Sequence, residues 1–135
     1  KDLELGLTSA KYIIGNDYEI NLIKDRIKNW KKIFADKIVI TTLGEQGATI
    51  EGTSQTIKIK PVKVAKVVNT TGAGDAWRGG FLAGLERNFD LPTAGQMGAV
   101  AASFAVENHG TQEHSYSKSL FTKRYKDTYN ETLVL

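Results

Sequence analysis

Residues 69–75 constrain this chain more than any other segment, because they read Asn-Thr-Thr-Gly-Ala-Gly-Asp and lead into an apolar, helix-length stretch. A turn of small residues leaves backbone N–H groups without partners at the start of a helix. Those donors, together with the positive end of the helix dipole, favour an anion such as phosphate. Asp75 falls in the first helical turn, where it either complements the dipole or takes a proton from an attacking hydroxyl. An ordinary strand-to-helix turn also fits residues 72–75, so these four residues alone leave both interpretations open.

The flanking residues extend the pattern. Residues 66–68 (Lys-Val-Val) predict a short strand before the turn, and the helix after it runs to about Asn88. Small residues recur on one face of that helix, at Ala76, Gly80, Ala83 and Gly84. Adjacent glycines weaken a helix, so Gly79 and Gly80 need a packing reason or a ligand. A second small-residue stripe follows in the next predicted helix, at Ala94, Gly98, Ala101 and Ala105.

Residues 70–81 closely resemble the second signature of the PfkB, or ribokinase-like, carbohydrate and nucleoside kinases. The resemblance implies ATP-dependent transfer of a γ-phosphoryl group to a primary hydroxyl of a ribonucleoside (adenosine-like) or a sugar. It implies an anion hole and a catalytic base at Gly72, Ala73, Gly74 and Asp75. We expect Gly74 to need a backbone conformation that β-branched residues resist. The family signature usually begins with Asp, whereas this chain has Asn69, which keeps the turn-forming hydrogen bonds and loses the charge.

Two other nucleotide-binding motifs are excluded by spacing. No Gly-x-x-x-x-Gly-Lys-Ser/Thr string is present, so the chain has no P-loop. A dinucleotide fingerprint would need a third glycine where the chain has Trp77.

Asn16 and Glu19 have the spacing of a helix capping box, and that structural role accounts for both residues. The family resemblance adds a metal role, in which Asn16 and Glu19 handle Mg²⁺ and phosphate. Glu19 would act mostly through water, because Mg²⁺ keeps much of its hydration shell.

Two glycine-containing loops are candidate ATP-binding segments. Thr42, Gly44 and Gly47 follow a β-branched strand; they fit an ordinary turn, and the resemblance implies that they approach the ATP phosphates and ribose. Residues 106–112 (Val-Glu-Asn-His-Gly-Thr-Gln) end a helix, with Gly110 as a left-handed C-cap. The resemblance implies that this loop, with Asn108 and Gly110, lines the adenine pocket. Together with Arg78 it favours the adenosine-kinase-like branch, and Arg78 itself is either a phosphate contact or a surface ion-pair partner.

The order of expected elements predicts a single α/β layered domain over residues 1–135. We expect strands at residues 12–14, 37–42, 48–51 and 56–60, and helices at residues 19–34, 75–88, 92–108 and 118–129. The resemblance implies the ribokinase-like three-layer α/β/α fold, of which this chain is only the C-terminal, ATP-binding and catalytic portion. The family's N-terminal glycine signature and sugar lid are not in the sequence, so we expect the isolated chain to be incomplete and inactive.

The composition of the chain argues against several other classes of function. Hydrophobic residues make up 41% of the 135 residues and charged residues 24%, as in an ordinary globular domain. A net charge of +3 gives no reason to expect nucleic acid as a partner, and no apolar run reaches the roughly 18 residues of a membrane span. The chain has no cysteine, and its two histidines, His109 and His114, do not share a helix face, so a zinc site is not expected.

We expect a cytoplasmic protein with a small-molecule partner; a homodimer is compatible with the sequence. The alternative function is a non-catalytic nucleotide-binding module, or half of a split protein that needs a partner.

Overall fold

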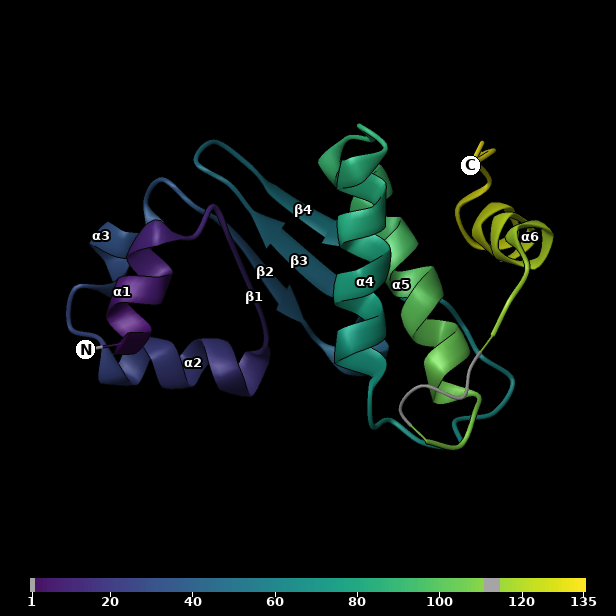
Figure 1. The fold of residues 1–135 in the computed structure, drawn as a ribbon, viewed down its shortest axis with the longest axis horizontal. Helices are drawn as coiled ribbons and strands as arrows, with labels where there is room; N and C mark the ends of the chain where they lie inside the picture. The colour runs from purple at the N-terminus through teal and green to yellow at the C-terminus, as the bar shows by residue number, and fades with distance from the viewer. Residues whose placement is uncertain (1, 111–114) are drawn as a thin grey trace. The chain divides into compact units, whose positions relative to one another are not determined.

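A computed structural model describes residues 2–110 and 115–135, which divide into two compact units, residues 1–58 and residues 59–135. Helices and strands alternate along the first unit and helices make up most of the second (Figure 1), which confirms the expected α/β class. The first unit contains α1 (Asp2–Ser9), β1 (Tyr12–Asn16), α2 (Asp17–Arg26), α3 (Trp30–Phe34), β2 (Ile38–Thr42), the short 3₁₀ helix η1 (Gly44–Gln46), β3 (Ala48–Glu51) and β4 (Thr56–Ile59, whose last residue is the first of the second unit). The second contains α4 (Ala73–Glu86), α5 (Leu91–Val106) and α6 (Lys118–Tyr129).

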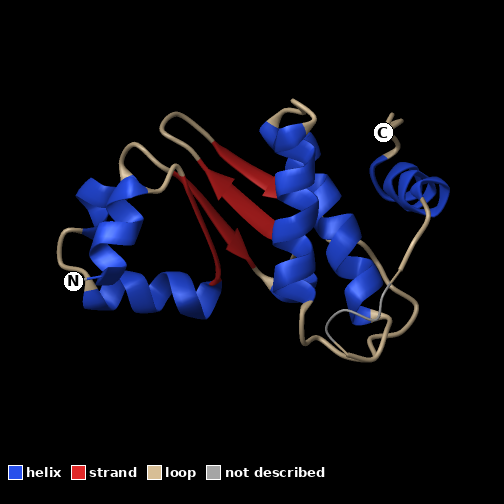
Figure 2. Ribbon diagram, in the orientation of Figure 1, coloured by secondary structure: helices blue, strands red, loops and turns tan. Residues whose placement is uncertain are grey.

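The four strands form one mixed sheet in the order β1-β2-β3-β4, drawn in red in Figure 2. β1 and β2 are parallel, and β2 and β3 are antiparallel. The β3–β4 turn is closed by the Gly52 N–H, which donates to the carbonyl of Gln55 at 2.9 Å. The sheet confirms four of the five expected strands and the central place of the β-branched strand β2. Its parallel pair ends at Asn16 and Thr42, which face each other across the strands.

The helix expected over residues 19–34 is wrong as a single element. α2 ends at Arg26, and Ile27 adopts an extended conformation (φ −112°, ψ 103°) before α3 begins at Trp30. The break lets both short helices contribute to one apolar core, because Ile20, Ile27 and Ile33 remain buried in the same cluster. α1 was not expected either; its Leu7 joins that cluster.

The two predicted small-residue stripes meet where α4 packs on α5, the pair of helices drawn side by side in the second unit (Figure 1). A Cβ atom added to Gly80 would lie 2.6 Å from the Met97 carbonyl oxygen, and one added to Gly84 would lie 2.8 Å from the Ala94 Cα. Real Cβ atoms essentially never come this close to other backbones. The glycines therefore permit an approach that a larger residue would prevent.

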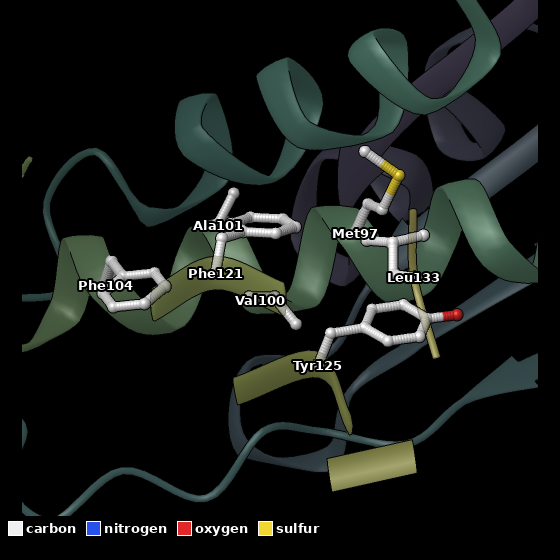
Figure 3. Close-up of a cluster of buried hydrophobic side chains, with 7 residues drawn as sticks. All are labelled: Met97, Val100, Ala101, Phe104, Phe121, Tyr125 and Leu133. Carbon is white, nitrogen blue, oxygen red and sulfur yellow. The ribbon is translucent and has the colours of Figure 1, made fainter. Parts of the chain in front are cut away.

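α5 and α6 share an apolar cluster in the second unit (Figure 3). Its buried members are Met97, Val100, Ala101, Phe104, Phe121, Tyr125 and Leu133. α6 begins where expected, because the Ser117 side chain accepts a hydrogen bond from the Leu120 N–H at 3.1 Å. The cluster fixes α6 against α5 by burial of apolar surface.

The strand expected at residues 66–68 is wrong. The N–H groups of Val68 and Asn69 donate to the carbonyl of Val106, at 2.7 and 3.2 Å, rather than to a neighbouring strand. The last turn of a helix leaves carbonyls without intrahelical partners, and Val106 is the last residue of α5. The short apolar segment is therefore held at the end of a helix.

Among the described residues, no helix combines the length and apolar character needed to cross a bilayer.

Candidate active site

The turn before α4 is built by Asn69 and Gly72. The Asn69 side-chain oxygen accepts a hydrogen bond from the Thr71 N–H at 2.8 Å, which is the turn-forming role expected of Asn. Gly72 is the N-cap of α4 and adopts the left-handed conformation (φ 87°), which glycine reaches without steric cost. The helix then starts with a hydrogen bond from the Ala76 N–H to the Gly72 carbonyl at 2.9 Å.

This N-terminal turn of α4, residues 72–75, is open on the side of Gly74. A Cβ atom added there would meet nothing within 4 Å. The N-cap Gly72 supplies no side-chain hydrogen bond, and the N–H groups of Gly74 and Asp75 fall in the first turn, where α-helices offer no intrahelical acceptor. Donors in that arrangement are suited to an anion. The expectation that Gly74 needs an unusual backbone is wrong: Gly74 is helical, and Gly72 is the left-handed residue.

Asp75 projects its carboxylate into solvent, with 82% of the side chain exposed. Its Oδ1 atom accepts a hydrogen bond from Arg78 Nη1 at 2.8 Å, one helical turn further along α4. Of the two interpretations of Arg78, the ion pair is therefore present in the structure, and contact with phosphate stays a prediction. The sequence left both roles of Arg78 open and did not identify Asp75 as its partner.

In the first unit, Asn16 and Glu19 form the expected capping box at the start of α2. Asn16 Oδ1 accepts from the Glu19 N–H at 2.8 Å, and Glu19 Oε2 accepts from the Asn16 N–H at 2.9 Å. No group of three or more His, Asp or Glu side chains suited to a metal exists among the residues described. One exposed carboxylate fits a hydrated Mg²⁺ and not a closed cage of protein ligands. Asn16 Oδ1 and Glu19 Oε2 both take part in the helix cap. A role of Asn16 and Glu19 in holding Mg²⁺, through water at Glu19, stays a prediction.

The loop after β2 contains the three residues expected to approach ATP. Thr42 ends β2, and its hydroxyl is 3.5 Å from the Gly15 carbonyl on β1. Gly44 and Gly47 have left-handed φ values of 57° and 90°; Gly44 is the first residue of η1 and Gly47 follows its last. The Leu43 N–H donates to the Gly47 carbonyl at 2.8 Å and closes the loop. Asn16 and Thr42 are register partners in the sheet. The residues of this unit that are expected to bind metal and nucleotide therefore lie at the same ends of two parallel strands.

The loop after α5 differs in part from expectation. Glu107 is the C-cap of α5, so Gly110 is not the cap, although it is left-handed as predicted (φ 79°). Asn108 Nδ2 donates to the Phe104 carbonyl at 2.8 Å, a bond that secures the helix end. Thr111, Gln112 and His114 lie outside the described residues.

Sequence reasoning missed a polar cluster on α5 and α6. The Arg124 guanidinium binds Glu107 at 2.8 Å and the Ser103 hydroxyl at 3.0 Å, and it lies 3.7 Å from the centre of the Phe104 ring. Arg124 also borders a hollow of about 460 Å³ between α6 and residues 60–63. The residues that line this hollow are Lys60, Pro61, Lys63, Leu120, Lys123, Arg124, Asp127 and Thr128. None of the predicted site residues is among them, so the hollow offers no support for their roles.

Comparison with known proteins gives a consistent result. Residues 2–118 match the model of the pfkB family of carbohydrate kinases. A nucleoside kinase of Methanothermobacter thermautotrophicus is 31% identical over 126 residues, which cover 91% of this chain and 40% of that protein.

Two solved structures are also similar. The nucleoside kinase of Burkholderia thailandensis in complex with inosine superposes with a TM-score of 0.92 at 32% identity, over 97% of this chain and 45% of that one. The nucleoside kinase of Methanocaldococcus jannaschii, described as an archaeal member of the ribokinase family, gives a TM-score of 0.83 at 28% identity, over 90% of this chain and 41% of that one. This chain thus spans less than half the length of these relatives and has part of the ribokinase-like fold. With the family model matched over most of its length, the chain belongs to the pfkB family of carbohydrate kinases.

Proposed function

We propose that this chain supplies the catalytic base and the nucleotide-binding loops of a cytoplasmic small-molecule kinase. The enzyme transfers the γ-phosphoryl group of ATP to a primary hydroxyl of a ribonucleoside or a sugar. The observation that carries the proposal is the N-terminal turn of α4, where Asp75 exposes its carboxylate beside two first-turn N–H groups and open space at Gly74. A base next to an anion-binding turn is what phosphoryl transfer from a hydroxyl acceptor requires.

Each site residue has one proposed role in this reaction. Asp75 accepts the proton of the acceptor hydroxyl as that oxygen attacks the γ-phosphorus. The backbone N–H groups of Gly72 and Gly74 donate hydrogen bonds to the oxygens of the moving phosphoryl group. Ala73 differs from the expectation, because its N–H already donates to the Thr70 carbonyl at 3.2 Å. Glu19 would hold Mg²⁺ through water, and that ion when bound offsets negative charge on the phosphates.

The nucleotide itself would be bound by the loop residues of each unit. Thr42, Gly44 and Gly47 would bind the phosphates and ribose, and Asn108 and Gly110 would border the adenine. The left-handed glycines in both loops support this, because a chain without Cβ atoms lets a ligand approach the backbone closely.

The acceptor is best supported as a purine ribonucleoside. The similar proteins named above are nucleoside kinases, and one of the solved structures contains inosine. The family as a whole is named for carbohydrates, so sugars belong in the same test.

The decisive experiment measures ATP-dependent phosphorylation of adenosine, inosine and ribose by the full-length protein, with ADP release and phosphorus NMR of the product as readouts. We expect transfer to a nucleoside, and we expect Asp75→Asn to lower turnover by roughly 10²–10⁴-fold while ATP affinity by calorimetry stays close to wild type. A variant with near-normal turnover would remove Asp75 from the role of base.

The same assay tests the alternative, a nucleotide-binding module or half of a split protein. If the full-length wild-type protein binds ATP and phosphorylates no acceptor, the module is supported and the kinase is rejected. The 135-residue chain alone should bind ATP weakly and transfer nothing, and efficient transfer by it would contradict our view that the site needs residues outside this chain.

A further inference from the structure

The ion pair between Arg78 and Asp75 involves the residue proposed as the base. Arg78 Nη1 lies 2.8 Å from Asp75 Oδ1, and both residues belong to the first two turns of α4. Side chains on a helix lean toward its N-terminus. The guanidinium of Arg78 is therefore carried back over the turn that contains Asp75, on the side where helix donors point.

Stability does not account for this pair. The Asp75 side chain is 82% exposed and that of Arg78 is 38% exposed, and ion pairs in such surroundings contribute little to the free energy of folding. A cation in the N-terminal half of a helix also gains nothing from the helix dipole. The ion pair instead fixes the orientation of the Asp75 carboxylate, because an exposed carboxylate without a partner samples several rotamers.

We propose that Arg78 is a positioning residue for the base Asp75, an inference that rests on the proposed function. By donating to Oδ1, Arg78 holds the carboxylate in one orientation and presents Oδ2 to the acceptor hydroxyl. The hydrogen bond from Arg78 Nη1 is made to Oδ1 and not to Oδ2. A general base has to reach its proton at hydrogen-bond distance, and small errors in placement are costly in rate.

The step that Arg78 assists is balanced as follows. The acceptor hydroxyl gives its proton to Asp75 Oδ2, and its oxygen forms a bond to the γ-phosphorus. The bond between that phosphorus and the bridging oxygen breaks, and ADP leaves with the electron pair. Arg78 keeps all of its protons throughout, and its hydrogen bond to Oδ1 is retained when Asp75 becomes neutral.

The planar guanidinium group of Arg78 is suited to this role. A guanidinium donates from a planar, fixed set of N–H groups, whereas the lysine ammonium is a compact charge on a flexible stem. Arg78→Lys should therefore keep part of the positioning, and Arg78→Ala should lose all of it. The matched control is Arg87→Ala: Arg87 follows the last turn of the same helix, and its Nη1 donates to the Ala83 carbonyl at 3.2 Å.

The test is steady-state kinetics of the full-length protein with ATP and the nucleoside that the wild type phosphorylates best. We expect Arg78→Ala to lower kcat by roughly 10- to 100-fold with KM for ATP nearly unchanged, and Arg78→Lys to recover part of the loss. Added guanidinium ion should partly restore Arg78→Ala, which a purely structural role would not allow. Because Arg78 acts through Asp75, the double variant Asp75→Asn/Arg78→Ala should be no slower than Asp75→Asn alone.

The outcomes separate the two proposals. If the wild type transfers no phosphoryl group, the proposed function fails first. If the wild type is active and Arg78→Ala equals Arg87→Ala in kcat, the positioning role is wrong. A rise in KM for ATP at constant kcat would also overturn it, because Arg78 would then bind the nucleotide rather than orient the base. Thermal melting of both alanine variants verifies that each is folded.

Discussion

α4 is closed along one face and open at its N-terminal turn, and glycine serves the two regions in different ways. On the face toward α5, a Cβ at Gly80 would lie 2.6 Å from a backbone oxygen. At Gly74 and Gly79, a Cβ would meet nothing within 4 Å. A glycine in a crowded place is explained by packing, whereas a glycine in open space at a helix start needs another reason. For Gly74 the reason that we propose is the approach of a phosphate.

The start of α5 shows how a helix in the same unit is closed by a side-chain cap. There the N-cap Asp90 accepts a hydrogen bond from the Thr93 N–H at 2.9 Å, and Pro92 occupies the second helical position, where it has no N–H to offer. α4 has Gly74 and Asp75 at the corresponding second and third positions and no side-chain cap. Of these two neighbouring helices, therefore, α5 has a side-chain cap for its third N–H and no N–H at its second position, whereas α4 has N–H groups at both positions and no side-chain cap.

The largest effect should come from filling the closed face. Gly80→Val places a branched side chain against the backbone of α5, so we expect the free energy of unfolding of the full-length protein to fall by about 3 kcal/mol. Chemical denaturation measures it. The control is Gly79→Val, which makes the same change in helix propensity in open space. Equal losses in the two variants would show that close packing is not the reason for glycine at position 80.

A substitution that makes the open turn resemble the start of α5 should act on activity and not on stability. Gly74→Pro removes one N–H that has no intrahelical acceptor, so the melting temperature should stay near that of the wild type. If that N–H binds the transferred phosphoryl group, kcat/KM should fall by about 100-fold. Gly74→Ala is the control, because it keeps the donor. A proline variant with normal turnover would exclude this N–H from the anion hole.

The contrast between the two regions also divides what the sequence could predict from what it could not. The glycine stripe and the capping box at Asn16 follow from spacing along one helix, and both expectations were confirmed. The choice of Gly72 over Gly74 as the left-handed residue depends on where the first helical hydrogen bond forms, and spacing alone leaves that open. The segment at Val68 resembled a strand, but it binds the carbonyl of Val106. Such a partner, far away in the chain, is not encoded in a local pattern.

The break at Ile27 has a similar cause. Apolar residues at helical spacing continue through it, so the pattern predicts one long helix, yet two shorter helices bury the same residues in the core. Burial of those residues is common to both arrangements, and only the packing of the whole unit selects between them. The roles of the site residues remain predictions for a related reason, because they depend on how ligands bind, which spacing along the chain does not determine.

At the start of α5, removal of the cap should have a moderate effect on stability alone. Asp90→Ala deletes the acceptor for the Thr93 N–H, and we expect the free energy of unfolding to fall by about 1 kcal/mol at neutral pH with kcat unchanged. Hydrogen bonds from the side chain and backbone of Thr93 lower the pKa of Asp90 below its ordinary value of 3.8. The stabilisation from its charge is therefore fully present above that value and is lost as the pH falls through the lower, folded-state pKa.

Denaturation of Asp90→Asn, which keeps a neutral cap, isolates that charge. Its difference from the wild type should shrink as the pH falls below 3.8, and a difference that grows there would contradict the sign of the shift.

The smallest expected effect is an increase in stability. Gly79 is exposed, lies in the interior of α4 and has no neighbour within 4 Å of a Cβ atom. Alanine loses less backbone freedom on folding than glycine, so Gly79→Ala should raise the free energy of unfolding by about 0.5–1 kcal/mol and leave kcat/KM unchanged. Comparison of the two positions tests whether open space around a glycine is enough to indicate a function. Gly74 and Gly79 are equally uncrowded, but only Gly74 belongs to the first turn. Paired melting curves and kinetics of Gly79→Ala and Gly74→Pro measure both quantities. If Gly79→Ala is less stable or slower than the wild type, position 79 also requires glycine. The N-terminal turn would then not be the only open part of α4 that has a function.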